Sequence, residues 1–95
     1  MAELRVTRSE GEHKYLLLAG EHEAGYITYG ERDGEVILFH TEVHEAVEGR
    51  GLGSTLVSGA LDDIRARGLK AVVLCPFARA YLKRHPEYGD LVARG

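Results

Sequence analysis

The amino-acid sequence predicts a protein of the α/β (α+β) class, with a mixed, mostly antiparallel sheet of about five strands and two helices. Three observations lead to this prediction. The first half of the chain alternates apolar and polar residues with the two-residue period of β-strands. A glycine cluster then precedes a segment with the 3.6-residue period of a helix. A short apolar run and a second helical pattern follow, so the expected order is four strands, a helix, a strand and a helix.

The four expected strands occupy the first half of the chain. They comprise the alternating residues around Leu4 and Val6, followed by the segments 14–19, 24–30 and 35–43. Asp33 and Gly34 separate the last two segments, and an Asp-Gly pair in this position is a strong signal for a hairpin. Because side chains alternate along a strand, the last segment is expected to carry two sets of side chains: Ile37, Phe39, Thr41 and Val43 on one face, and Leu38, His40 and Glu42 on the other.

The second half is expected to form helix, strand and helix. Its first part carries an apolar stripe at helical spacing, made of Leu52, Leu56, Ala60 and Ile64. Gly68 lies where a helix-terminating glycine belongs. The run 70–75, KAVVLC, is typical of a buried strand, and a second helix is expected between Pro76 and Pro86. Strand–helix–strand units cross over right-handed, so 35–43 and 70–75 are expected to be parallel neighbours.

Length and composition favour one small soluble domain over residues 1–95. The apolar fraction is 44%, the charged fraction is 28% and the net charge is −3, so no basic face for nucleic acid is expected. No apolar run has the length of a membrane span, and the N-terminus lacks the core of a signal peptide. The one cysteine, Cys75, suits a reducing compartment. We therefore expect a cytoplasmic protein without membrane or nucleic-acid partners, which is a monomer or a weak dimer.

The glycine cluster at the start of the first expected helix favours an anion site. The first backbone N–H groups of a helix have no intrahelical partner, and the helix dipole makes that end partly positive. Glycines allow an anion to approach these donors. The residues that could contribute are Gly49, Arg50, Gly51, Leu52 and Gly53, with hydroxyl groups from Ser54 and Thr55. A tight turn with close packing is the alternative interpretation.

The segment VHEAVEGRGLGSTL resembles the acyl-CoA-binding motif of the GNAT N-acetyltransferase superfamily. In that motif a strand ends in valine, and a Gln/Arg-x-x-Gly-x-Gly/Ala sequence then opens a helix. Val43 matches the valine, Glu48 takes the place of Gln/Arg, and Gly51 and Gly53 match the glycines. The segment ARAYLKRH is similar to the superfamily's next helix, where Tyr81 matches a tyrosine that faces the CoA sulfur.

Three segments, HTEV, EGRGLGSTLV and CPFARAYLKRHPEY, resemble a subfamily of very short GNAT-like proteins over nearly the whole chain. The resemblance implies a minimal GNAT-like fold with acetyl-CoA as co-substrate. It also implies that most of the acceptor half of a full-length enzyme is absent. The pantetheine is expected along the strand that ends at Val43, whose N–H could stabilise the oxyanion. The pyrophosphate is expected at the glycine loop. Tyr81 is the expected acid for the leaving thiolate, with core packing as the alternative.

Cys75 and His40 are the other candidate catalytic residues. Cys75 ends a strand immediately before the second helix, where a helix N-terminus stabilises a thiolate. His40 lies near the end of the neighbouring strand, so the two side chains are expected to converge, as in a Cys–His nucleophile pair. Acetyl could pass through Cys75, or His40 could be the base in direct transfer. Cys75 as a small core residue and Glu42 as the base are the alternatives. No metal site is expected.

These observations predict an acetyl-CoA-dependent N-acetyltransferase. Its acceptor is expected to be an amine on a peptide, a protein or a small molecule. The alternative is a module that binds coenzyme A and acts in interaction or regulation without significant turnover.

Overall fold

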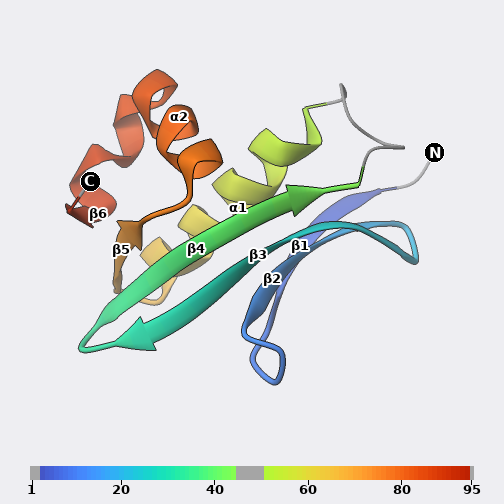
Figure 1. Cartoon of the computed structure of the whole chain (residues 1–95), viewed down its shortest axis with the longest axis horizontal. Coiled ribbons are helices and arrows are strands. Elements are labelled where there is room, and N and C mark those ends of the chain that lie inside the picture. Colours follow the sequence, from blue (N-terminus) through green and yellow to red (C-terminus); the bar gives the residue numbers. More distant parts are fainter. Residues whose placement is uncertain (1–2, 45–50, 95) are drawn as a thin grey trace.

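The computed structural model describes residues 3–44 and 51–94. These residues form one sheet of six strands, two α-helices and the 3₁₀ helix η2 (Figure 1). The elements in chain order are β1 (Leu4–Ser9), β2 (Lys14–Ala19), β3 (His22–Arg32), β4 (Glu35–Val43), α1 (Leu52–Ala66), β5 (Lys70–Val73), α2 (Pro76–Arg84), η2 (Pro86–Leu91) and β6 (Val92–Arg94). The predicted fold class is therefore confirmed.

The first four strands form an antiparallel meander, as the alternation of the sequence predicts. The hairpin between β3 and β4 turns at Asp33 and Gly34, whose φ angles are 52° and 79°. Two consecutive residues with positive φ form the turn that matches the twist of paired strands, which explains the preference for Asp-Gly. Arg32 then pairs with Glu35 across the turn.

The last two strands extend the sheet in parallel. β4 pairs with β5 and β5 pairs with β6, both parallel, so the prediction that 35–43 and 70–75 are parallel neighbours is confirmed. The sixth strand and η2 are differences from the sequence-based expectation. β6 has three residues, which is too short for an alternating pattern to identify. α2 ends near the expected Pro86, but the chain then continues as a 3₁₀ helix.

A β-bulge in β4 changes the expected register. Thr28 pairs with His40, but its neighbour Tyr29 pairs with Leu38, which leaves Phe39 as an extra residue. An extra residue reverses the alternation of side chains along the rest of the strand. Leu38 is buried in the core, whereas the side chain of His40 is 60% exposed. The predicted grouping of Leu38 with His40 is therefore wrong.

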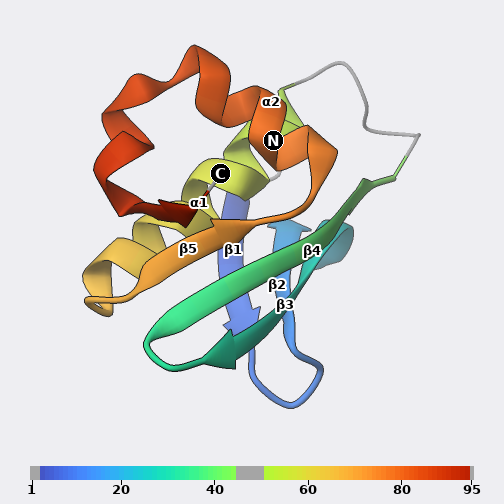
Figure 2. The same cartoon turned by 60° about the vertical axis from the view of Figure 1, so that its left-hand side comes forward.

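The core lies between the sheet and α1, and both helices lie on the same face of the sheet (Figures 1 and 2). The predicted stripe of α1 is buried, with two further residues, as Leu52, Leu56, Val57, Ala60, Leu61 and Ile64. The helix ends at the predicted glycine: Gly68 has φ 72°, its N–H bonds to Arg65 O, and Leu69 N–H bonds to Ile64 O. This pair of bonds is the Schellman motif.

Gly59 brings α1 close to the edge strand β1. A Cβ atom at residue 59 would lie 2.5 Å from Cγ2 and 2.6 Å from Cβ of Val6. Val6 is branched at Cβ, so its side chain has few rotamers by which to withdraw. The absence of a side chain at Gly59 is therefore a packing requirement.

A polar cluster joins the C-terminal half of α1 to the meander. The hydroxyl of Tyr15 donates a hydrogen bond to Oδ2 of Asp63 over 2.7 Å, and Arg8 Nε lies 3.3 Å from the same oxygen. Arg67 donates to Glu31 of β3 over 2.8 Å. Burial and the hydrogen bond to Asp63 raise the pKa of Tyr15 above its ordinary value of 10.0.

Gly59→Ala is expected to destabilise the fold. Overpacking costs about 1–3 kcal/mol and helix propensity returns at most about 1 kcal/mol, so a net loss of roughly 1 kcal/mol should appear in urea unfolding. Val6→Ala removes the two Cγ atoms that crowd residue 59 but keeps Cβ, so in the Val6→Ala background the added Gly59→Ala should cost less than it does in the wild type. Gly89→Ala, where an added Cβ would meet nothing within 4 Å, is the control. Equal effects of Gly59→Ala in both backgrounds would contradict this account.

Tyr15→Phe is expected to cost about 1.5 kcal/mol, because it removes a hydrogen bond to a carboxylate. It should also change the pH dependence of unfolding. The unfolded state loses the phenol proton from about pH 10, whereas the folded state retains it, so the wild-type free energy of unfolding falls as pH rises above 10. The free energy of unfolding of the variant should fall less over the same pH range. An identical fall in both proteins would contradict the raised pKa.

Candidate functional site

The candidate site lies where β4 and β5 diverge. Their pairing ends at Leu38 and Val73, after which Leu74 N–H and Cys75 N–H both bond to Leu38 O, over 3.0 and 3.2 Å. β4 continues to Val43 beyond the last residue that has a register partner in β5. Within residues 3–44 and 51–94, no strand pairs with the edge of β4 that faces away from β3 over its last five residues.

The first turn of α1 faces this divergence with unpaired backbone donors. Gly51, at the N-cap, has φ 71°, and the first helical bond runs from Thr55 N–H to Gly51 O over 3.1 Å. The N–H groups of Leu52, Gly53 and Ser54 precede that bond and have no intrahelical partner. The N-cap residue, Gly51, has no side chain that could cap them, and the first turn contains no acidic residue. This arrangement favours an anion.

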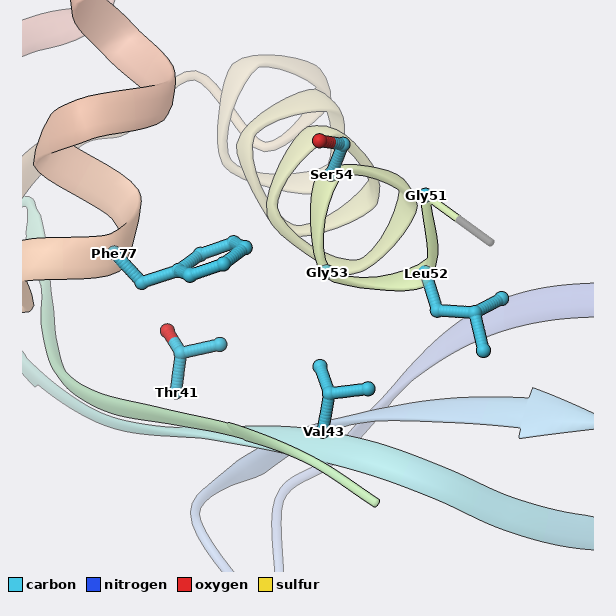
Figure 3. A pocket seen from close by; sticks show the side chains of 7 residues that line it. All are labelled: Thr41, Val43, Gly51, Leu52, Gly53, Ser54 and Phe77. Atoms are coloured by element: carbon cyan, nitrogen blue, oxygen red, sulfur yellow. The ribbon is translucent and has the colours of Figure 1, made fainter. Parts of the chain in front are cut away.

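A cavity of about 370 Å³ lies between this helix terminus, the end of β4 and the start of α2. Figure 3 shows Phe77 pointing from α2 towards α1 over Thr41. A Cβ atom at residue 53 would lie 2.3 Å from Cζ of Phe77, so the glycine also serves close packing. The lining residues are Thr41, Val43, Gly51, Leu52, Gly53, Ser54 and Phe77.

Cys75 does not line this cavity, but it contacts a residue of the cavity wall. It is the N-cap residue of α2, with Pro76 opening the helix as predicted, and only 2% of its surface is exposed. Its Sγ atom lies 2.9 Å from Oγ1 of Thr41, which lines the cavity. Thr41 thus forms the connection between the cavity and the thiol.

The structure does not bring His40 to Cys75. After the bulge at Phe39, the side chain of His40 lies on the open face of the sheet, opposite to the helices. There its Nε2 atom is 3.3 Å from Oε1 of Glu42, and its ring centroid is 6.3 Å from that of Tyr26. The expected Cys–His convergence fails because one extra residue in β4 turns Thr41 towards Cys75 instead.

Tyr81 is buried on the core side of α2 and does not line the cavity. Its ring stacks on His85, with centroids 4.0 Å apart and an interplanar angle of 18°, and lies 6.1 Å from the ring of Tyr88. These contacts join α2 to η2. They account for the burial of Tyr81 as packing, and its role as an acid stays a prediction.

Only some of the predicted cofactor-binding residues line the cavity. Val43, Gly51, Leu52, Gly53 and Ser54 line it, whereas the hydroxyl of Thr55 donates back to Gly51 O over 3.1 Å. Gly49 and Arg50 lie outside the described residues.

Two residues of the cavity were not identified as site residues from the sequence. The sequence places Thr41 on a strand face without indicating a role, and Phe77 has no signal beyond its place in an expected helix. The HTEV and CPFARAYLKRHPEY segments that support the family resemblance contain both residues. Their contacts depend on the bulge and on the approach of α2 to α1, which no local pattern indicates.

A larger groove, of about 590 Å³, lies on another side of α2, lined by residues that include Arg79, Lys83 and Val92. Figure 2 shows α2 and η2 above the β5–β6 edge that borders it. We favour the smaller cavity because the N–H groups at the start of α1 that have no intrahelical partner face it.

Over residues 3–44 and 51–94, no three metal-ligating side chains form a group suited to a metal ion. Neither described α-helix is long and apolar enough to cross a bilayer.

Comparison with known proteins gives consistent matches. The model of the GCN5-related N-acetyl-transferase family matches residues 14–91. Human Protein NATD1 is 34% identical over 85 residues, which cover 87% of this chain and 75% of NATD1. The zebrafish (Danio rerio) protein of the same name is 33% identical over 90 residues, covering 90% and 81%. The NMR structure of a GCN5-like protein from Staphylococcus aureus superimposes with a TM-score of 0.73 at 27% identity, covering 100% of this chain and 93% of that one.

A double-mutant cycle is expected to show coupling between Gly53 and Phe77. The Cβ atom added by Gly53→Ala collides with the phenyl ring, and Phe77→Ala removes the collision. Residues in contact usually couple by about 0.5–3 kcal/mol, so Gly53→Ala should be better tolerated in the Phe77→Ala background. Gly89→Ala should be additive with Phe77→Ala. Additivity at Gly53 as well would show that Phe77 does not pack there.

Proposed function

The chain belongs to the GCN5-related N-acetyltransferase family, and we propose that it transfers acetyl from acetyl-CoA to an amine. One observation carries this proposal. Within the described residues, the N–H groups at the start of α1 that lack an intrahelical partner and the edge of β4 beyond its pairing with β5 border one cavity, and Thr41 of its wall contacts Cys75. A diphosphate group suits the first feature, and an extended chain with amide groups suits the second. Coenzyme A contains both.

The residues present fit coenzyme A. The N–H groups of Leu52, Gly53 and Ser54 would bind the pyrophosphate, and the left-handed Gly51 holds no side chain in their way. The backbone of β4 up to Val43 would hold the pantetheine as a further strand would be held. The apolar walls formed by Val43, Leu52 and Phe77 would exclude water from the thioester. Acetyl-CoA supplies the activated acyl group.

Two routes for the acetyl group remain within this proposal. In the first, Sγ of Cys75 attacks the thioester carbon and acetyl then passes to the amine. In the second, the amine attacks directly, and His40 with Glu42 accepts its proton. Because these two side chains lie on the open face of the sheet, the second route requires the amine to arrive from that face. The acceptor is a peptide, a protein or a small molecule, and the unpaired thiol of Cys75 is consistent with a cytoplasmic location.

A module that binds coenzyme A without significant turnover is the second candidate. It is favoured by the burial of Cys75 and by the packing of Tyr81 against His85, which leaves the proposed acid in a stacked cluster. Both candidates require coenzyme A in the same cavity. They differ in whether the acetyl group is transferred from coenzyme A to an acceptor.

Thermal unfolding with acetyl-CoA, coenzyme A and ADP is the first experiment. A ligand at about a hundred times its Kd adds roughly 2.7 kcal/mol of stability, which raises the Tm of a domain of this size by about ten degrees or more. We expect this shift with both CoA species and a smaller one with ADP. No shift with either CoA species would contradict the proposed function.

A matched pair of variants tests the site. Gly51→Ala and Gly34→Ala both place a side chain at a positive φ, of 71° and 79°, where an added Cβ would meet nothing within 4 Å. Both should lower the Tm by strain, but only Gly51→Ala should also weaken the shift produced by coenzyme A. Formation of free coenzyme A with a panel of amines and lysine peptides then separates the two candidates: amine-dependent release supports the transferase, and binding without release supports the module.

A further inference from the structure

The hydroxyl of Thr41 lies beside the Cys75 thiol and in the cavity wall, and neither of the two routes above gives it a role. Its Oγ1 atom lies 2.9 Å from Sγ of Cys75, within hydrogen-bond distance, and either atom can be the donor. The thiol is buried, whereas Thr41 also lines the cavity proposed for the thioester. Figure 3 shows this side chain between β4 and the ring of Phe77.

The bulge in β4 places this hydroxyl there. Without the extra residue at Phe39, regular alternation would turn His40 to the helix side and Thr41 to the open face. The fold therefore presents the thiol with a neutral hydroxyl from β4 instead of an imidazole. A threonine hydroxyl donates one proton and accepts another, so it can move a proton without becoming charged.

We infer that Thr41 relays the proton between the Cys75 thiol and the sulfur of coenzyme A. This inference rests on the proposed function and concerns its covalent route. While Cys75 carries its proton, the thiol donates to Oγ1. When the proton leaves, the Thr41 hydroxyl donates to Sγ and holds the nucleophile towards the cavity.

The acetyl group is transferred in two steps, and the atoms and protons balance in each. In the first, a bond forms between Sγ and the acetyl carbon, and the bond from that carbon to the CoA sulfur breaks. The thiol proton passes to Oγ1 while the hydroxyl proton of Thr41 passes to the departing sulfur, which leaves as a thiol. In the second, the amine nitrogen bonds to the acetyl carbon, the bond to Sγ breaks, and one amine proton returns through Thr41 to Sγ. Thr41 and Cys75 end unchanged.

The surroundings of Cys75 agree with a neutral relay. On β4, the neighbours His40 and Glu42 face the opposite side of the sheet. On α2, Arg79 N–H donates to Cys75 O over 3.0 Å, which joins the backbone of the first turn, and Tyr81 stacks on His85. α1 contributes Gly53 and Ser54 to the adjoining cavity wall.

Three variants test the relay by intact-mass measurement of Cys75 acetylation in single-turnover mixtures with acetyl-CoA. Thr41→Val keeps the shape but removes the hydroxyl, Thr41→Ser keeps the hydroxyl, and Thr7→Val on β1 is the control for loss of a strand hydroxyl elsewhere. Proton transfer by a positioned group contributes about 10²–10⁴-fold to rate. We therefore expect Thr41→Val to slow acetylation about 100-fold, Thr41→Ser to stay within about tenfold of the wild type, and Thr7→Val to match it.

Thermal shifts with coenzyme A, measured on the same samples, separate the relay from the binding site. Retained shifts with slow acetylation of Thr41→Val, and rescue by Thr41→Ser, support the relay. Equal acetylation rates for Thr41→Val and wild type overturn it. A wild-type protein that binds coenzyme A but never carries acetyl on Cys75 also overturns it and leaves the binding site intact. Absence of any shift in the wild type is failure of the proposed function itself.

Discussion

The single extra residue in β4 is the constraint on which the candidate site depends. Up to Leu38 the strand pairs with β5 and turns its even-numbered side chains into the core. The bulge at Phe39 then reverses the alternation, at the same level at which β4 and β5 separate. One irregularity therefore accompanies an open strand edge, brings Thr41 to Cys75 and sends His40 to the opposite face. The proposed cavity chemistry and the proposed acceptor side follow from this division of the two faces.

The two ends of α1 differ in how their terminal backbone groups are hydrogen-bonded, and this difference bears on function. Its C-terminal end is saturated by the Schellman bonds at Gly68 and joined to the meander by Asp63 and Arg67. Its N-terminal end begins at a left-handed glycine, which has no side chain that could act as a cap. Packing of the buried stripe holds the whole helix against the sheet. The free energy gained by this packing offsets the cost of an uncapped N-terminus. A helix end left unsatisfied on a stable scaffold is suited to bind an anionic ligand.

Much of the fold could be predicted from the sequence because local signals and global structure agree. Asp33-Gly34 adopts the conformation that its hairpin requires, Gly68 ends α1, and Pro76 opens α2. Of the site, the glycine loop predicts the first turn of α1, and the resemblance to the acyl-CoA-binding motif predicts Val43. The bulge could not be predicted, because Phe39 and His40 are both exposed and neither marks an inserted residue. The pairing of Thr41 with Cys75, and of Phe77 with Gly53, depends on contacts between segments distant in sequence.

An NMR titration of the ¹⁵N-labelled chain with coenzyme A tests the central claim most directly, because it reports where the ligand lies without assuming turnover. The account predicts that the largest amide shifts fall on Leu52, Gly53 and Ser54 and along the end of β4 from Thr41 to Val43. Shifts concentrated instead in the groove beside Arg79, Lys83 and Val92 would contradict it, because coenzyme A would then bind away from the divergence of β4 and β5.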